Sequence, residues 1–326
     1  MSWLADQVGG VQTWLFEVAV QPALYWLDLA SLSDPAYDSL EWLIWGVLEI
    51  AVLYAILRPL EARIPAEHWS SRRQVGIDVL YTLIHRLGVV PLAFFLLLTP
   101  VVDWAEGALR LAGLRTFNLE DALPWLATSP LAAFFVYLVV LDLADYWRHR
   151  FQHRFEWWWS LHALHHSQRQ MSFWTDNRNH LLDDLFGSLW FAGIALVIGV
   201  EPGQFLLIVI GARMIESFSH ANIRIWFGAL GERLLVSPRY HRRHHAIGFG
   251  HEGPSRGCNF AVLFPVWDVV FGTADFTRSL GPTGIRDQIA GARYGDGFWE
   301  QQWLGLRRMA RALRRPAADP QSTSAA

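Results

Sequence analysis

The sequence predicts an all-α integral membrane protein, a bundle of about four to five membrane helices, including a helical hairpin, with a cytosolic histidine-rich cap. Three observations lead to this prediction. The 326 residues are 52% hydrophobic and only 17% charged, with 18 Trp and 20 Phe. The apolar residues gather in long runs, and roughly 20 such residues cross a bilayer as a helix. Eight of the 13 histidines lie in three short clusters beside these runs.

The N-terminal part is expected to be apolar but not cleaved. Residues 1–40 carry no basic stretch and no small-residue cleavage site, which favours an interfacial or marginal membrane segment over a signal peptide. Membrane helices are predicted within residues 41–147, in apolar runs at 42–57, 77–104 and 122–147. Buried helices of a large soluble protein are the alternative, but tryptophans and arginines at the run ends favour a membrane.

The remaining chain alternates polar and apolar stretches. Residues 148–275 are expected to form a catalytic region that contains the histidine clusters and a membrane hairpin at 185–215. We place the turn of this hairpin at GVEPG, residues 199–203. Residues 276–326 are predicted to be a C-terminal cytosolic tail with a disordered end.

The distribution of arginine predicts the orientation. Arginine-rich segments at 58–73, 148–178 and 213–243 fall on one side of the membrane if the hairpin enters and leaves by the same face. The positive-inside rule makes that side cytoplasmic. We therefore expect a protein of the inner or cytoplasmic membrane, with the histidine clusters and the C-terminus in the cytoplasm.

The histidine clusters read HRFQH at 149–153, HALHH at 162–166 and HRRHH at 241–245. Residues three and four apart share one face of an α-helix, with Cβ atoms about 5–6 Å apart, so each cluster can direct its imidazoles at one point. A lone histidine is usually a surface or core residue, but three clusters with the helical spacings HxxxH and HxxHH indicate metal ligands. The candidates are His149, His153, His162, His165, His166, His241, His244 and His245.

The ligand type and count indicate two metal ions. Imidazole suits zinc, copper, iron and nickel, and eight or more imidazoles exceed the four ligands of a structural zinc site. The one cysteine, Cys258, excludes intrachain disulfides, thiolate sites and iron–sulfur clusters. Iron is the expected metal if the chemistry uses oxygen. The net charge of -3 gives no support for nucleic-acid binding.

Two further positions follow the hairpin. His220, in ESFSHANI, is the candidate ninth ligand, although a histidine packed at the hairpin's end is the alternative. Glu216 lies four residues earlier on the same helical face, where it could bridge the metals or lie just outside them. A solvated glutamate is the alternative there.

Other polar residues could support the ligands. His180, in DNRNHLLDD, is a possible ligand or supporting residue. Asp145 precedes His149 by four residues, so its carboxylate could accept a hydrogen bond from the non-ligating imidazole nitrogen, and Asn222 could act similarly. Three histidines outside the pattern are expected to be structural, His68, His85 and His251.

These motifs resemble those of the fatty acid hydroxylase and sterol desaturase superfamily of integral membrane, histidine-box di-iron oxygenases. The matching elements are the three clusters, SHAN at 219–222 and NFAVLFPVWDVVFGT at 259–273, and the matched order spans roughly 142–273. The resemblance implies an enzyme in which the clustered imidazoles, His220 included, hold two iron ions. It also implies O2-dependent hydroxylation or desaturation of a lipid C–H bond. Some members carry HxxxH where this chain has Glu216 and His220.

The expected partners are a lipid substrate, O2, surrounding membrane lipid and a separate electron-donor protein, cytochrome b5-like or a ferredoxin with its reductase. The donor must be separate because the sequence contains no dinucleotide or P-loop motif. Hydroxylation, desaturation and alkyl-ether oxidation share one metal core, so an alkyl-ether lipid monooxygenase is an alternative.

Two other classes of membrane protein also bind metal through histidine. A membrane metal carrier or sensor would place polar ligands near mid-membrane, and a bis-histidine cytochrome would need single histidines facing each other across the bundle. Both fit the observed clusters less well than an oxygenase does.

Overall fold

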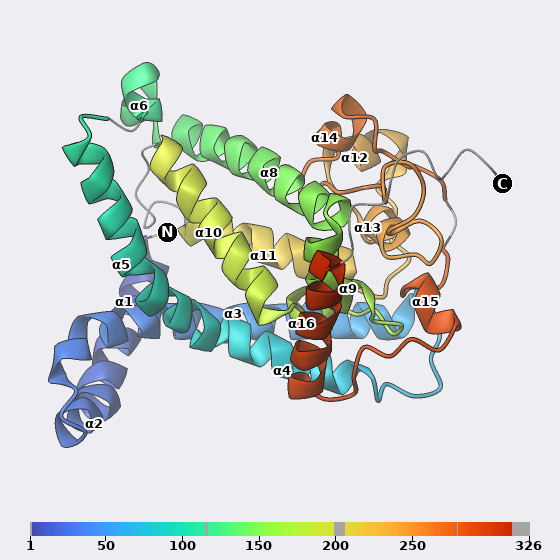
Figure 1. The fold of residues 1–326 in the computed structure, drawn as a ribbon. Helices are drawn as coiled ribbons and strands as arrows, with labels where there is room; N and C mark the ends of the chain where they lie inside the picture. Colours follow the sequence, from blue (N-terminus) through green and yellow to red (C-terminus); the bar gives the residue numbers. More distant parts are fainter. Residues whose placement is uncertain (1, 115–116, 199–205, 279, 315–326) are drawn as a thin grey trace.

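The computed structural model describes residues 2–114, 117–198, 206–278 and 280–314. Within these ranges the regular structure is helical, with two isolated β-bridges, Pro65 to Ile223 and Ala246 to Thr283. Figure 1 shows long helices on one side of the molecule and short helices with loops on the other. The predicted all-α fold is confirmed.

The chain begins with short helices that expose large aromatic side chains. These are α1 (Ser2–Leu15), the π-helical turn η1 (Phe16–Val20), α2 (Gln21–Trp26) and the 3₁₀ turn η2 (Ala30–Leu32). Trp3 is 70% exposed and Trp26 is 84% exposed. Exposed tryptophans are typical of the level where a membrane meets water.

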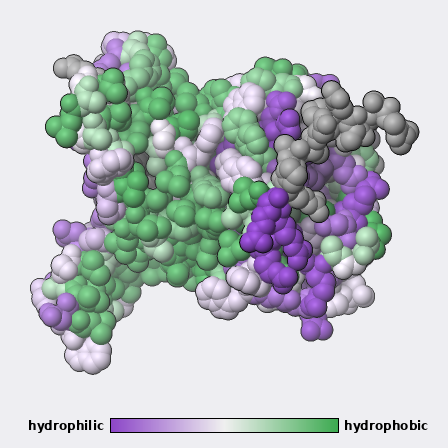
Figure 2. Space-filling view, viewed as in Figure 1, coloured by the Kyte–Doolittle hydropathy of each residue, from purple (hydrophilic) through white to green (hydrophobic). Residues whose placement is uncertain are grey.

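Four helices are long and apolar enough to cross a membrane: α3 (Ser33–Arg63) with the turn before it, α5 (Val89–Leu111), α8 (Pro130–Arg154) and α10 (Leu181–Ile198). Few of their residues are buried inside the protein. Figure 2 shows hydrophobic side chains covering this half of the molecule. Apolar helices with apolar outer faces need a lipid solvent, so the chain is an integral membrane protein.

Several boundaries differ from those predicted. The run at 77–104 is broken into α4 (Val75–Arg86) and α5, because Gly88 adopts the left-handed conformation, with φ of 86°. α8 begins at Pro130 rather than at 122, after the short helices α6 (Leu119–Ala122) and α7 (Trp125–Thr128). Proline at the first position of a helix is well tolerated, since its missing N–H has no partner there anyway.

The predicted hairpin corresponds to α10 and α11 (Leu206–His220). Its predicted turn at 199–203 lies outside the described residues. Ile198 of α10 and Ile208 of α11 share a core cluster with Tyr137 of α8. The two helices therefore meet at their apolar ends, and His220 lies at the other end of α11.

The cap consists of short helices around α9 (Glu156–His166), which follows α8 after Phe155. The others are η3 (Thr175–Asn177), α12 (Gly228–Leu234), α13 (Pro238–His244), α14 (Val266–Val270), α15 (Arg286–Ile289) and α16 (Phe298–Arg314). α16 lies along α9 (Figure 1), where Arg308 Nε donates to Ser160 O at 3.2 Å. The region predicted as a tail thus contains a packed helix, and the end predicted to be disordered, 315–326, lies outside the described residues.

A buried guanidinium joins the membrane helices to the cap. Arg86, 1% exposed, donates to Glu49 of α3, to Asp176 Oδ2 at 3.0 Å and to Ser217 Oγ at 2.7 Å. α3 approaches so closely that a Cβ on Gly46 would lie 1.7 Å from the Arg86 carbonyl oxygen. Only glycine permits this contact.

Candidate metal centre

The nine histidines predicted as ligands lie together inside the cap. Two come from the last turns of α8, three from α9, one from the end of α11 and three from α13 and the residue after it. None is more than 6% exposed. They divide into two groups, His149, His153, His162, His166 and His244, and then His165, His220, His241 and His245.

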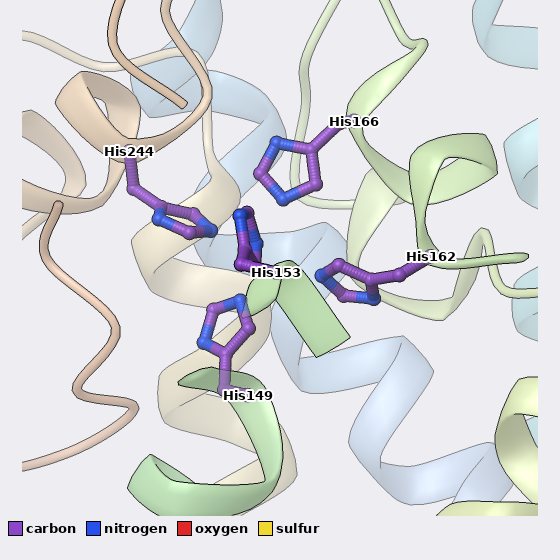
Figure 3. Close-up of side chains that lie close together, drawn as sticks. All are labelled: His149, His153, His162, His166 and His244. Atoms are coloured by element: carbon purple, nitrogen blue, oxygen red, sulfur yellow. The ribbon is translucent and has the colours of Figure 1, made fainter. Parts of the chain in front are cut away.

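In the first group, five imidazoles converge on one point (Figure 3). Each offers a nitrogen, and these five atoms lie within 4.8 Å of one another. All five Nε2 atoms are buried and have no hydrogen-bond partner among the described residues. A buried polar atom without a partner is costly and rare, so five in one place fit a bound metal ion.

In the second group, the Nε2 atoms lie almost in contact. His220 Nε2 is 3.0 Å from His165 Nε2 and 3.0 Å from His241 Nε2, and His241 Nε2 is 3.1 Å from His245 Nε2. Two imidazole nitrogens bound to one ion at about 2.1 Å and at right angles lie about 3.0 Å apart. The observed spacing therefore fits four imidazoles that share one ion.

Backbone carbonyls orient the first group. His149 Nδ1 lies 2.8 Å from Phe260 O, His244 Nδ1 lies 2.7 Å from Cys258 O, and His153 Nδ1 lies 3.2 Å from Arg256 O. A carbonyl only accepts, so each Nδ1 carries the hydrogen and each Nε2 keeps a lone pair toward the common point. This outer contact fixes the tautomer that a metal ligand requires.

Asn259 holds the loop that carries these carbonyls. Its backbone is left-handed, with φ of 57°, a conformation that asparagine tolerates better than most residues. Its side chain donates to Tyr240 O at 3.0 Å and to Asp275 O at 3.0 Å, and accepts from Asp275 N at 2.7 Å. Asp268 holds the next residues by accepting from Phe260 N at 2.8 Å. The closing segment at 259–273 and the residues just before it therefore support these imidazoles through the backbone.

Asp183 supports the first group through a side chain and was not predicted. Its Oδ2 lies 3.1 Å from His162 Nδ1, and its Oδ1 accepts from Gln152 Nε2 at 2.8 Å and from Trp158 Nε1 at 2.7 Å. The available signal was the Asp-Asp pair in the first turn of α10. In the second group, the equivalent acceptor for His220 Nδ1 is the Glu216 carbonyl, at 2.7 Å.

The carboxylates and amide predicted to support the ligands have other partners. Asp145 Oδ1 accepts from Arg148 Nε at 2.6 Å, while the His149 nitrogen it was expected to hold faces Phe260. Asn222 holds the backbone of Glu67, with its Oδ1 accepting from Glu67 N at 3.0 Å.

His180 and Glu216 belong to neither group of histidines. His180 Nε2 lies 2.8 Å from Gln302 O on α16, and its Nδ1 accepts from Leu182 N. Glu216 offers its backbone carbonyl to His220, and its carboxylate is absent from the described groups of possible metal ligands.

His85 and His251, which were expected to be structural, lie outside both groups of histidines. His85 Nε2 lies 2.9 Å from Asp184 Oδ2. His251 stacks on Trp159, with ring centroids 3.6 Å apart and planes at 7°.

Burial favours the neutral form of four of these imidazoles. Loss of hydration, followed by the neighbouring imidazoles, lowers the pKa of His166, His241 and His245 well below the usual value of 6.5. Burial lowers the pKa of His244 to about 3. Neutral imidazole is the form that binds metals, so the cap holds its histidines ready to bind.

The histidine clusters lie within a region that resembles known proteins. Residues 134–273 match the sequence model of the family described as fatty acid hydroxylase. The chain is 30% identical to alkylglycerol monooxygenase of Homo sapiens over 178 residues, which are 54% of this chain and 36% of that protein. It is 28% identical to alkylglycerol monooxygenase of Danio rerio over 133 residues, 41% of this chain and 28% of that protein.

A third relative gives a similar result. Alkylglycerol monooxygenase of Caenorhabditis elegans is 28% identical over 165 residues, 49% of this chain and 30% of that protein. The chain therefore spans about a third of the length of these curated relatives. No solved structure matches the chain.

Proposed function

We propose that this chain, a member of the fatty acid hydroxylase and sterol desaturase superfamily, is a membrane-bound di-iron oxygenase that oxidises a C–H bond of a lipid with O2. One observation carries the proposal: nine buried imidazoles in two adjacent groups, with the lone-pair nitrogens of each group converging. A carrier that releases its metal would need accessible ligands, whereas none of these is more than 6% exposed.

Each group would hold one iron ion. The first ion would be bound by imidazoles of α8, α9 and α13, and the second by imidazoles of α9, α11 and α13. His165 and His166 are neighbours on α9 but fall in different groups, so this helix would bring the two ions together. When bound, a pair of reduced iron ions supplies the means to activate O2.

The chain's own residues position and protect the centre. Carbonyl oxygens of the 256–260 loop and the Asp183 carboxylate hold the imidazoles of the first group. Phe260, 0% exposed, lies against the rings of His149, His153 and His244 and keeps bulk water from them. Exclusion of water limits side reactions at an oxidising centre.

A lipid substrate would arrive from the bilayer. The first two ligands would lie on the last turns of α8, a candidate membrane helix, and the same cap is where α10 begins and α11 ends. An apolar chain in the membrane therefore needs to move only to the end of these helices. We propose that the cap faces the cytoplasm, as the arginine-rich segments predict.

An alkyl-ether lipid is the substrate class we favour, because several relatives are named alkylglycerol monooxygenase. Hydroxylation of the carbon beside an ether oxygen consumes O2, two electrons and two protons, and yields a hemiacetal and water. The hemiacetal then separates into an aldehyde and the free glycerol hydroxyl. A separate one-electron carrier, cytochrome b5-like or a ferredoxin, would supply the electrons.

The test uses the detergent-purified full chain with a reductant and O2. We expect an alkylglycerol to yield the corresponding aldehyde, detected by mass spectrometry, with one O2 consumed per aldehyde. A matched acylglycerol should yield none, because it has an ester in place of the ether. The His244→Ala variant is the control for the metal centre. Failure of the alkylglycerol alongside oxidation of a fatty acid would reject the ether substrate, and failure of all lipids would reject the oxygenase.

A further inference from the structure

α16 presents three distinct faces along its length. The face against the protein contains Gln301, Gln302 and Gly305, all buried. Gln302 Oε1 accepts from Leu181 N at 2.8 Å, and Gln302 Nε2 donates to Tyr81 Oη at 3.0 Å. A Cβ on Gly305 would lie 2.3 Å from His180 Cδ2, so the helix is seated closely on the start of α10. The other two faces are free of such contacts.

The second face is an apolar stripe. Residues 299, 303, 306, 310 and 313 follow one another at intervals of four and three, which places them on one side of a helix. The members are Trp299, Trp303, Leu306, Ala310 and Leu313. Trp299 is 78% exposed, Trp303 is 61% exposed and Leu313 is 63% exposed. Three large apolar side chains in a row would not remain in water without a partner.

The third face is a basic stripe beside the apolar one. Arg307, Arg311 and Arg314 are exposed and also follow intervals of four and three. No ion pair joins any of them to a carboxylate within the described part of the chain. Glu300 is the one acidic residue of the helix. The outer surface of α16 therefore combines an apolar stripe with positive charge.

The position of α16 fits a membrane surface. Figure 1 shows α16 running across the direction of α3 and α8, at the end of the membrane helices where the cap begins. Figure 2 shows its hydrophilic surface next to the hydrophobic belt. A helix that lies in the plane of a membrane has this anatomy, with tryptophan on one face and arginine on the other.

We propose that α16 lies at the membrane surface and binds anionic lipid headgroups. The apolar stripe enters the boundary between headgroups and acyl chains, and the three arginines contact lipid phosphates. Each basic residue near an anionic membrane strengthens binding by roughly fivefold. Because the opposite face of α16 is packed on α9, which carries His162, His165 and His166, bound lipid also stabilises the support of the metal centre.

A depth measurement tests this proposal. A spin label is placed at Ala310, on the apolar stripe, by Ala310→Cys in a Cys258→Ser background. A label at Ala292, an exposed loop residue, is the control. The full chain is studied in vesicles of phosphatidylcholine alone and in vesicles that also contain phosphatidylglycerol. Collision with O2 reports lipid, and collision with a water-soluble nickel complex reports water.

We expect the label at 310 to be protected from nickel at least tenfold better than the label at 292 when phosphatidylglycerol is present. Protection should fall without phosphatidylglycerol, and also in the Arg307→Gln/Arg311→Gln/Arg314→Gln variant. Equal protection in both vesicles would overturn recognition of anionic headgroups. Equal nickel access at 310 and 292 would overturn membrane contact of the stripe, and magnetic coupling between two labels would overturn it in favour of a second copy of the chain. Since the readout needs no turnover, the result is independent of the proposed enzymatic function.

Discussion

Asp183→Asn tests the contact that holds His162. The wild-type carboxylate accepts three hydrogen bonds, from His162, Gln152 and Trp158. An asparagine in the same place has one acceptor oxygen, so in either amide orientation at least one donor faces another donor. If the amide nitrogen faces His162, the imidazole must move its hydrogen to Nε2 and loses the lone pair that would bind the metal.

Loss of such an outer contact lowers metal affinity by roughly 10- to 100-fold, about 1.4–2.7 kcal/mol. We expect a value near the upper end, measured by competition with a chelator in detergent. Asp184→Asn is the matched control, because the neighbouring carboxylate bonds to His85 outside both groups. The reasoning would be refuted if Asp183→Asn kept wild-type affinity for both metals, or if Asp184→Asn lost as much.

Three further substitutions give clear expectations. Gly46→Ala places a Cβ 1.7 Å from the Arg86 carbonyl oxygen and should lower the free energy of unfolding by about 1–3 kcal/mol or more, measured by thermal denaturation. The control Gly193→Ala adds a Cβ that meets nothing within 4 Å and should leave the free energy of unfolding unchanged. Burial lowers the pKa of His251 to about 4, with smaller contributions in the same direction from the nearby Arg256 and His162. The stability that neutral His251 contributes is therefore complete above pH 6.5, the ordinary pKa of histidine, and is lost as the pH falls toward 4. His251→Phe keeps the stack on Trp159 and should reduce the acid sensitivity of unfolding; an unchanged pH profile would contradict the assignment. His165→Ala should abolish turnover in the aldehyde assay, while carbonate extraction of membranes should show that the variant still inserts. A variant that still turned over would exclude His165 as a ligand.

The sequence predicted which histidines would meet, because their spacing is a local helical property. Intervals of three and four residues on α9 and α13 determine which imidazoles share a face. The prediction that each cluster directs its imidazoles at one point is wrong for the second and third clusters. In each of them, the two histidines four residues apart share a group, whereas the third histidine, His165 or His244, joins the other group. Which group a histidine joins depends on how α9 and α13 are rotated against the other helices. Rotation of a helix is set by packing across the fold.

The supporting contacts were predicted least well, because most of them are backbone carbonyls. Nothing in the side chains at 256, 258 and 260 indicates that their carbonyls face imidazoles, because this follows from the backbone path of a loop with positive φ at Arg256, Gly257 and Asn259. His180 had the composition of a ligand, yet its partner is α16, more than 100 residues later in the chain. A contact of that separation has no local signature.

The central claim is that the cap holds two metal ions per chain, one in each group of histidines. The most direct measurement is elemental analysis of the detergent-purified chain beside His153→Ala and His241→Ala, which each remove a ligand from one group. The account predicts two iron ions per wild-type chain and the loss of one ion in each variant. A single ion per chain, a heme, or a variant that loses no metal would contradict it.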